Sequence, residues 1–330
     1  NGAYNILREW QLATGGYPIL DIMSDDAVKG SNTGDGFEIG VDENFAHTAS
    51  EGSIERYYKT VYEGIRRANL VINEVPKINM DAALRDRFIA EARFLRGYHY
   101  SVLIRSFGAV PKVTEIDPTL DLGRTAVDEI LSDLVYPDLE AAAAILPEKS
   151  EYAPEDLGRA TRGAALGLLT RVKLFYGDFA AVETLTRDII ESEEYELMAD
   201  FAEVFPGANE HNTESAFEIA ARPNIFEEGG NQYGNTLGVR GTPNKGWGFG
   251  RPAYAWIKNM EDRNDPRLEP SVLFLNEVID GTTISGESAT PDTIYDNGQI
   301  LEIEVYNQKV WFPGTETLTS FGHNRRIVRY

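Results

Sequence analysis

Residues 91–115 read EARFLRGYHYSVLIRSFGAVPKVTE, and their pattern is the most direct indication of the fold class. Together with the residues before it, it carries apolar side chains at steps of three and four, which place them on one face of a helix. These side chains are Phe88, Ala92, Leu95, Tyr98 and Val102. The helix begins near Asp81, and Gly108 and Pro111 end it. The stretch therefore predicts a long helix with one buried face.

Helical periodicity continues on both sides of this stretch. Upstream, a helix opens at Ser53 as N-cap and closes at Pro76, and downstream the pattern T-A-V-D at 125–128 resembles a capping box before a helix that Pro137 kinks. Residues 158–192 then form two helices joined by a turn at Gly177-Asp178, with small residues such as Ala164 and Ala165 for close packing. Helix pairs joined by tight turns predict a mainly α, tetratricopeptide-like scaffold.

The sequence changes character after about residue 200. Eight glycines lie between Glu227 and Arg251 without helical periodicity, SAFEIAA at 215–221 alternates like a strand, and Asp296-Asn297-Gly298 is a hairpin signal. We therefore expect a single domain over 1–330. Residues 1–200 form its mostly helical scaffold, and residues 201–330 form a loop-rich, ligand-side region with short β-hairpins.

Composition narrows the functional classes. A formal net charge of −22 over 330 residues opposes nucleic acid and favours neutral ligands. The absence of cysteine excludes disulfides, thiolate metal sites and cysteine nucleophiles. No apolar run in the sequence reaches the length of a membrane-spanning helix.

Four stretches together resemble the SusD-like (RagB/SusD) family of outer-membrane nutrient-binding lipoproteins of Bacteroidota. They are YYKTVYEGIRRANLVINEVP (57–76), EARFLRGYHYSVLIRSFGAVPKVTE (91–115), GRATRGAALGLLTRVKLFYGD (158–178) and NDPRLEPSV (264–272). TESAFEIA (213–220) and ILDIMSDDAVKG (19–30) fit the same pattern. Their order and spacing agree with the family over most of the chain.

The resemblance implies a scaffold of four tetratricopeptide-like helix pairs under a loop-rich region. It also implies non-catalytic glycan capture at the cell surface, without a cofactor, beside a SusC-like TonB-dependent transporter. Family members carry a lipid anchor on an N-terminal cysteine, and a segment like RIVRY (326–330) leads into further helices. The sequence has no such cysteine and ends at Tyr330, so we expect the anchor and the C-terminal helices to be missing. The apolar face that those helices cover would then be exposed and would promote aggregation.

A sugar site needs flat apolar surfaces and polar groups that hydrogen-bond hydroxyls. In NKGWGFGRPAYAW (244–256), glycines flank Trp247 and Phe249, which makes these rings the leading candidates for a sugar platform. Tyr233 is a further candidate ring, and Asn244 and Arg251 are candidate polar partners. Alternatively, the rings pin the loop to the scaffold. Trp256 is spaced with Ile257 and Met260 for the core of a short helix.

The early loop at 24–45 is the second candidate wall. Asp25, Asp26, Asn32 and Phe37 offer polar groups and a ring, although a solvated acidic loop is the alternative for each of them. The loop loosely follows a calcium-binding register, but a serine stands in place of the first acidic ligand, so the register does not establish a metal site.

Other polar residues fit structural roles. Glu91, Arg93 and Arg96, and likewise Arg159 and Arg162, favour ion pairs between helices over an anion site. His99 favours packing over ligand contact, and the four histidines show no metal-ligand spacing.

The sequence thus favours a non-catalytic protein that binds a neutral polysaccharide. A tetratricopeptide-type protein-interaction scaffold is the alternative. A glycoside hydrolase would need a pair of opposed carboxylates, and no motif in the sequence marks one.

Overall fold

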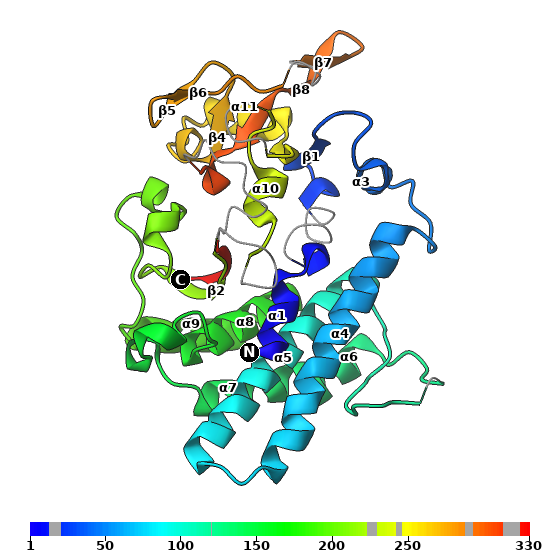
Figure 1. Cartoon of the computed structure of the whole chain (residues 1–330), viewed down its shortest axis with the longest axis vertical. Coiled ribbons are helices and arrows are strands. Elements are labelled where there is room, and N and C mark those ends of the chain that lie inside the picture. Colours follow the sequence, from blue (N-terminus) through cyan, green and yellow to red (C-terminus); the bar gives the residue numbers. More distant parts are fainter. Residues whose placement is uncertain (13–20, 120, 223–229, 242–245, 288–292, 313–323) are drawn as a thin grey trace.

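The long helices of the protein lie between residues 52 and 191, as the periodicity predicts. The structure, a computed structural model, describes residues 1–12, 21–119, 121–222, 230–241, 246–287, 293–312 and 324–330. The helices of this layer are α4 (Gly52–Glu74), α5 (Ala82–Phe107), α6 (Val127–Ile130), α7 (Tyr136–Ile145), α8 (Arg162–Phe175) and α9 (Phe179–Glu191). Each long helix packs on the next one along the chain, which gives the layer seen at the bottom of Figure 1.

Local signals set both ends of α5. The carboxylate of Asp81 accepts a hydrogen bond from the backbone N–H of Leu84 at 2.9 Å and caps α5, whose other end is Gly108 at φ +67°. Both ends were predicted from the sequence. The cap predicted at Ser53 is wrong, because Ser53 lies inside α4 and its hydroxyl donates to Asp42 at 2.9 Å.

The helix that was predicted to kink at Pro137 contains a wider turn just before the proline. A π-helical turn, Leu131–Val135, lies between α6 and α7, and Pro137 stands in the first turn of α7. Proline has no N–H to donate to the carbonyl four residues earlier, and the wider turn accommodates that loss. The capping box predicted at Thr125 does not form, because Ala126 occupies the N-cap position without a side-chain bond.

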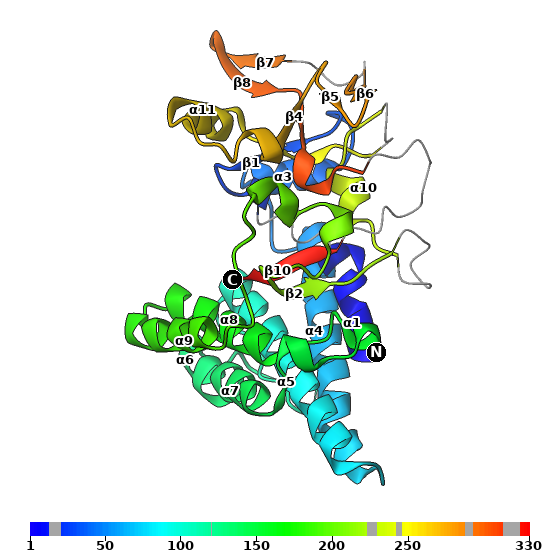
Figure 2. The same cartoon turned by 90° about the vertical axis from the view of Figure 1, so that its left-hand side faces the viewer.

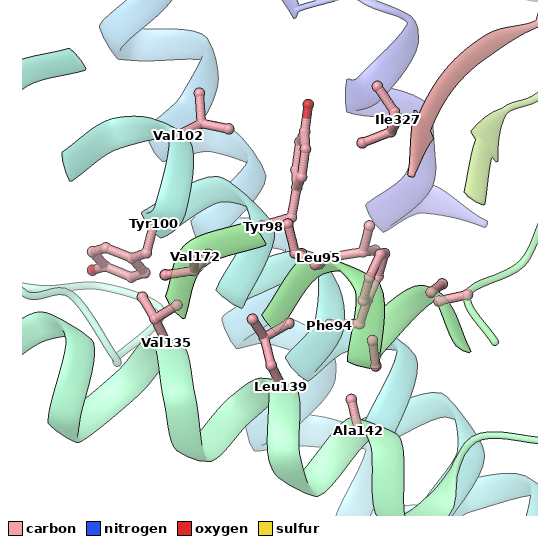
Figure 3. Packing of buried hydrophobic residues seen from close by; sticks show 14 of the residues in the cluster. Phe94, Leu95, Tyr98, Tyr100, Val102, Val135, Leu139, Ala142, Val172 and Ile327 are labelled. Carbon is pink, nitrogen blue, oxygen red and sulfur yellow. The ribbon is translucent and has the colours of Figure 1, made fainter. Parts of the chain in front are cut away.

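The main core surrounds α5. From Ala90 to Ile104 nearly every residue of this helix is buried, including polar ones, because α4 covers one side and α7 covers another. Figure 3 shows Phe94, Leu95 and Tyr98 of α5 packed with Val135, Leu139 and Ala142 of the next segment. The sequence predicted one buried face, whereas the structure has a central helix in a tetratricopeptide-like layer.

The end of this layer is apolar on its outside. Within the described residues, α9 has no fully buried side chain, although Leu185 and Ile189 pack against the main core, and Phe175, Phe179 and Ile190 are exposed. The four helix pairs implied by the resemblance are not all present in the described part, whose long helices are α4, α5, α7, α8 and α9.

Gly64 sets the spacing between α4 and α5. A Cβ atom added to this glycine would overlap the imidazole of the buried His99 on α5. We expect Gly64→Ala to lower the free energy of unfolding by about 1–3 kcal/mol through overpacking, measured by urea denaturation. Gly123→Ala is the matched control, since an added Cβ meets nothing within 4 Å there. Equal effects of the two substitutions would contradict this role for Gly64.

The strands form small antiparallel pairs beyond the helices. The pairs are β1 (Ala27–Gly30) with β3 (Phe249–Pro252), β2 (Ser215–Ile219) with β10 (Arg325–Arg329), β4 (Val272–Phe274) with β9 (Val305–Asn307), β5 (Val278–Ile279) with β6 (Thr282–Thr283), and β7 (Thr293–Asp296) with β8 (Gln299–Ile303). Figure 2 shows β2 and β10 next to the helices and the other labelled strands farther up. Phe217 and Val328 of the β2–β10 pair join the main core.

The predicted hairpin at 296–298 is confirmed. It joins β7 to β8, with Asn297 at φ +48° and Gly298 at φ +80°, the positive angles that a type I′ turn requires. Two short helices, α10 (Tyr233–Leu237) and α11 (Tyr254–Asp262), complete the strand-rich half. Among the residues that the structure describes, no helix is long and apolar enough to cross a bilayer.

Candidate functional site

The two candidate walls of the site are one structure. β1 of the early loop pairs with β3, with Ala27 opposite Pro252, Val28 opposite Arg251 and Gly30 opposite Phe249. Backbone bonds extend the pairing at both ends, from Ala253 N to Asp26 O at 2.9 Å and from Ser31 N to Gly248 O at 2.7 Å. The early loop thus belongs with the loop-rich region rather than with the helical scaffold.

Trp247 and Phe249 anchor this junction. Phe249 is buried against Ile22 and Ile39, and Trp247 packs against the same cluster while partly exposed. Trp10 joins the cluster from the N-terminal segment. The alternative interpretation, that the rings pin the loop, therefore fits Phe249, while Trp247 keeps part of its surface open.

Arg240 fastens three loops around this cluster. Its guanidinium lies 2.8 Å from the Asp35 carboxylate, donates to the Ser31 hydroxyl at 2.8 Å and contacts the Trp247 carbonyl at 3.3 Å. It also pairs with Glu287. Because the four partners come from three separate segments, Arg240 fixes the position of the Trp247 loop relative to the early loop.

A cavity of about 280 Å³ opens beside the β1–β3 pair, and we call it the loop-face cavity. Its apolar lining comes from Tyr233 and Leu237 of α10 and from Trp256 of α11. Its polar lining includes Ser24, Asp26, Asn307 and Lys309. Figure 1 shows β1, α10 and α11 in the same upper half of the molecule, away from the helical layer.

The polar groups that line the cavity differ in their exposure to solvent and in the contacts that they already make. Asp26 is exposed. Asn307 caps a short 3-10 helix, since its Oδ1 accepts from Lys309 N at 3.0 Å. Burial lowers the pKa of Lys309, and the positive charges of Arg329 and Arg267 lower it further. The ammonium also lies 5.0 Å from the ring centroid of Phe205.

This arrangement suits a polyhydroxylated ligand. Trp256 rests one side on the small core of Ile257, Val272 and Val305 and lines the cavity as well. An indole or phenol face stacks on an apolar sugar face, and carboxylate, amide and ammonium groups hydrogen-bond hydroxyls. The cavity offers each of these groups within one small volume.

The expectation for Trp256 was incomplete. The sequence placed it in the core, whereas the structure shows a partly buried ring that also borders the cavity. Asn307 and Lys309 were not singled out at all. Asn307 is the last residue of β9 and Lys309 lies two residues beyond it. Because the pairing of β9 with β4 places both here, no local signal marks them.

Of the candidate residues predicted from the sequence, some line the loop-face cavity and others do not. Asp26 and Tyr233 line the cavity, but Arg251 is only 2% exposed and pairs with Glu302 at 2.8 Å, which removes it from any surface in this structure. Phe37 is 78% exposed at the start of α3 (Phe37–Glu43), outside the cavity lining.

Three more candidates complete the set. Asn32 caps its own loop, accepting from Gly34 N at 3.0 Å. Asp25 is exposed and does not border the cavity. Asn244 lies outside the described residues.

Two acidic residues of the early loop are held in other contacts. Asp35 is engaged by Arg240, and the buried Asp42 accepts from Ser53. The described residues contain no group of three or more histidine, aspartate or glutamate side chains placed to hold a metal ion.

Ion pairs engage the predicted arginines, and the pair of Arg96 on α5 with Asp138 on α7 joins two helices. Arg96 binds Asp138 through two bonds of 2.6 and 2.9 Å, Arg159 pairs with Glu91 at 2.9 Å, and Arg162 pairs with Glu148 at 2.9 Å. These arginines therefore serve the scaffold.

Known proteins resemble this chain in sequence and in structure. A family model described as "Starch-binding associating with outer membrane", of the SusD-like group, matches residues 23–174. SusD-like protein P25 of Formosa agariphila is 30% identical over 199 residues, which is 58% of this chain and 36% of that protein. The chain thus spans little more than a third of the length of this relative.

Solved structures share the fold. A laminarin-binding SusD-like protein superposes with a TM-score of 0.81 at 23% identity, covering 99% of this chain and 75% of the other. Surface glycan-binding protein A from Bacteroides thetaiotaomicron, solved with laminarihexaose, gives 0.78 at 21% identity, with 99% and 74% covered.

Proposed function

The chain belongs to the SusD-like family of outer-membrane carbohydrate-binding proteins, and from this premise we propose that it binds a polysaccharide or oligosaccharide at the cell surface through the loop-face cavity. One observation carries the choice of site. The β1–β3 pair brings Asp26 of the early loop beside Tyr233 and Trp256, so that rings and a carboxylate line one cavity.

The ligand that best fits this cavity is a neutral glycan. Asp21 and Asp26 both line it, and the whole chain carries a net charge of −22, which opposes an anionic ligand at this place. Laminarin is the first probe to use, because two proteins of this fold carry laminarin or laminarihexaose in their descriptions.

We further propose that the bound glycan passes to a SusC-like TonB-dependent transporter and that a lipid anchor holds the full-length protein on the outer membrane. Binding without turnover fits such a role. Asp21 and Asp26 come from one turn, on the same wall of the cavity, whereas glycoside hydrolysis needs carboxylates that flank the bond. Desolvation raises the pKa of Asp21, so Asp21→Asn is the variant to compare if reducing sugar is released.

The proposed site is tested by removing the indole of Trp256, which is larger than the phenol ring of Tyr233 in the same lining. We expect Trp256→Ala to weaken laminarin retardation in affinity electrophoresis about tenfold, since stacking on an aromatic face contributes on the order of 1.4 kcal/mol. Tyr295→Ala is the matched control, because this ring is 64% exposed on β7 and does not border the cavity.

Other outcomes would redirect the proposal. Trp247→Ala tests the partly exposed ring of the neighbouring cluster, and a larger loss there would move the site to the Trp247 loop. Undiminished binding by both tryptophan variants would remove the loop face from the site. A panel of neutral glucans, fructans and mannans without any retardation would favour a protein-interaction scaffold.

A further inference from the structure

A second, larger hollow lies between the helical layer and the early loop. It has a volume of about 690 Å³ and is lined by the α3–α4 connection, the first turns of α4 and the end of α5. The rings of Phe45, Tyr58 and Phe107 form its walls, and we call it the aromatic groove. Met23 borders it, while the next residue, Ser24, borders the loop-face cavity, so one turn of chain separates the two.

Phe45 is presented to solvent at a cost in backbone strain. The ring is 64% exposed, and the residue has φ +53°, the left-handed conformation that glycine usually supplies just after a helix. A bulky side chain held in this conformation costs about 1–3 kcal/mol. The ring contacts the imidazole of His47, with centroids 6.5 Å apart, but a glycine here would relieve the strain, so turn geometry does not explain the phenylalanine.

The other two rings are fixed. Tyr58 and Phe107 pack edge to face, with centroids 5.0 Å apart, and Phe107 also contacts the buried Tyr57. The groove thus offers one solvent-facing ring together with an aromatic wall of two packed rings.

Two arginines of the groove have no carboxylate partner among the described residues. Arg105 uses Nε to donate to the Ser101 carbonyl at 3.0 Å and lies 5.9 Å from the Phe175 ring, which leaves its terminal nitrogens available. Arg124 is exposed and makes no hydrogen bond or ion pair with the described residues. The groove's carboxylate, Glu55, is paired with Lys59 at 2.6 Å.

Two guanidinium groups without a carboxylate partner among the described residues therefore border one hollow, in a chain with 53 acidic and 31 basic residues. Guanidinium binds carboxylate and sulfate oxygens through paired hydrogen bonds, and aromatic rings stack on the apolar face of a sugar. We propose that the aromatic groove is a second binding site, which takes an anionic sugar unit, with its ring against Phe45 and Tyr58 and its carboxylate or sulfate on Arg105 and Arg124.

The test compares ligands of different charge. Oligogalacturonate supplies a carboxylate, a carrageenan oligosaccharide supplies a sulfate, and laminarihexaose supplies neither, each titrated calorimetrically at low and high salt. We expect tighter binding of at least one anionic ligand at low salt, and loss of about tenfold in that affinity in the double variant Arg105→Met/Arg124→Met. The carboxylated and sulfated arms decide which anion the groove prefers.

The variant Phe45→Gly distinguishes a loss of ligand affinity from a loss of folding stability. We expect this variant to lose affinity for the anionic ligand several-fold while its urea midpoint stays equal or rises, because glycine accepts the positive φ. Arg263→Met is the matched charge control, since Arg263 is exposed and lies outside the groove. Arg124→Met alone guards against a folding effect of the Arg105 substitution.

Three results would overturn the second site. They are no preference for either anionic ligand over laminarihexaose, unchanged anionic binding in the double variant, and loss of anionic binding in Trp256→Ala, which would place that ligand in the loop-face cavity. Failure of laminarin binding with retained anionic binding would instead count against the proposed function and leave this inference standing.

Discussion

Asp138→Ala is expected to lower the free energy of unfolding by about 3–5 kcal/mol, because it leaves the Arg96 guanidinium buried without its counter-charge. Asp138 is 2% exposed and Arg96 is 8% exposed. Two hydrogen bonds, Nε to Oδ2 at 2.6 Å and Nη2 to Oδ1 at 2.9 Å, join them, and Arg96 Nη1 donates to Asn69 Oδ1 at 2.9 Å. The network therefore ties α5 to α7 and to α4.

Urea denaturation of three variants measures this effect. Glu183→Ala removes an exposed pair with Arg187 on α9 and should cost at most about 0.5 kcal/mol. The double variant Arg96→Met/Asp138→Leu replaces both charges by apolar groups and should recover much of the loss. A cost for Asp138→Ala as small as that of Glu183→Ala would show that water reaches Arg96.

The second large effect is a loss of stability in mild acid caused by His99. This side chain is fully buried, and neither ring nitrogen has a hydrogen-bond partner among the described residues. Burial lowers its pKa to about 3, from about 6.5 in an unfolded chain. Between these values the unfolded chain binds a proton that the folded chain does not, so stability falls as the pH drops below about 6.5, by up to about 1.4 kcal/mol per pH unit.

The comparison with His99→Leu isolates this contribution. At pH 8 the imidazole is neutral in both states, so the difference between the two proteins reflects packing alone. Between pH 6.5 and 4.5 we expect the wild type to lose about 2–3 kcal/mol relative to the variant, measured as unfolding free energy. Parallel pH profiles would mean that water or a polar group reaches the imidazole in the folded state.

Short-range signals predicted the scaffold well. Asp81, Gly108 and Asp178 act on their own helix ends, and the structure confirms each of them. The cap at Ser53 failed because the Asp42 carboxylate, from a neighbouring element, takes the serine hydroxyl. That competition depends on how α3 meets α4, which no window of sequence around Ser53 contains.

The sequence predicted which loops form the candidate site, but not the role of each residue in it. The choice of the two loops followed from aromatic and polar residues between glycines, and the structure brings these loops together through β1 and β3. The role of each residue depended on distant partners. Arg251 has the side chain of a ligand-binding group, but Glu302, about fifty residues onward, pairs with it in the interior.

The β1–β3 pair also constrains the order in which the molecule can be made. Its two strands lie roughly 220 residues apart in the chain, whereas each helix from α4 to α9 packs on one synthesised shortly before it. Contacts of short separation form early, and the closure of a long loop comes late. The helices can therefore pack on one another while residues 27–30 still lack their partner strand, and Ile327 and Val328 of β10 join the main core later. The β1–β3 pair, and with it the loop face, forms only once residues 249–252 are present, so a truncation before residue 249 should leave β1 without its partner strand.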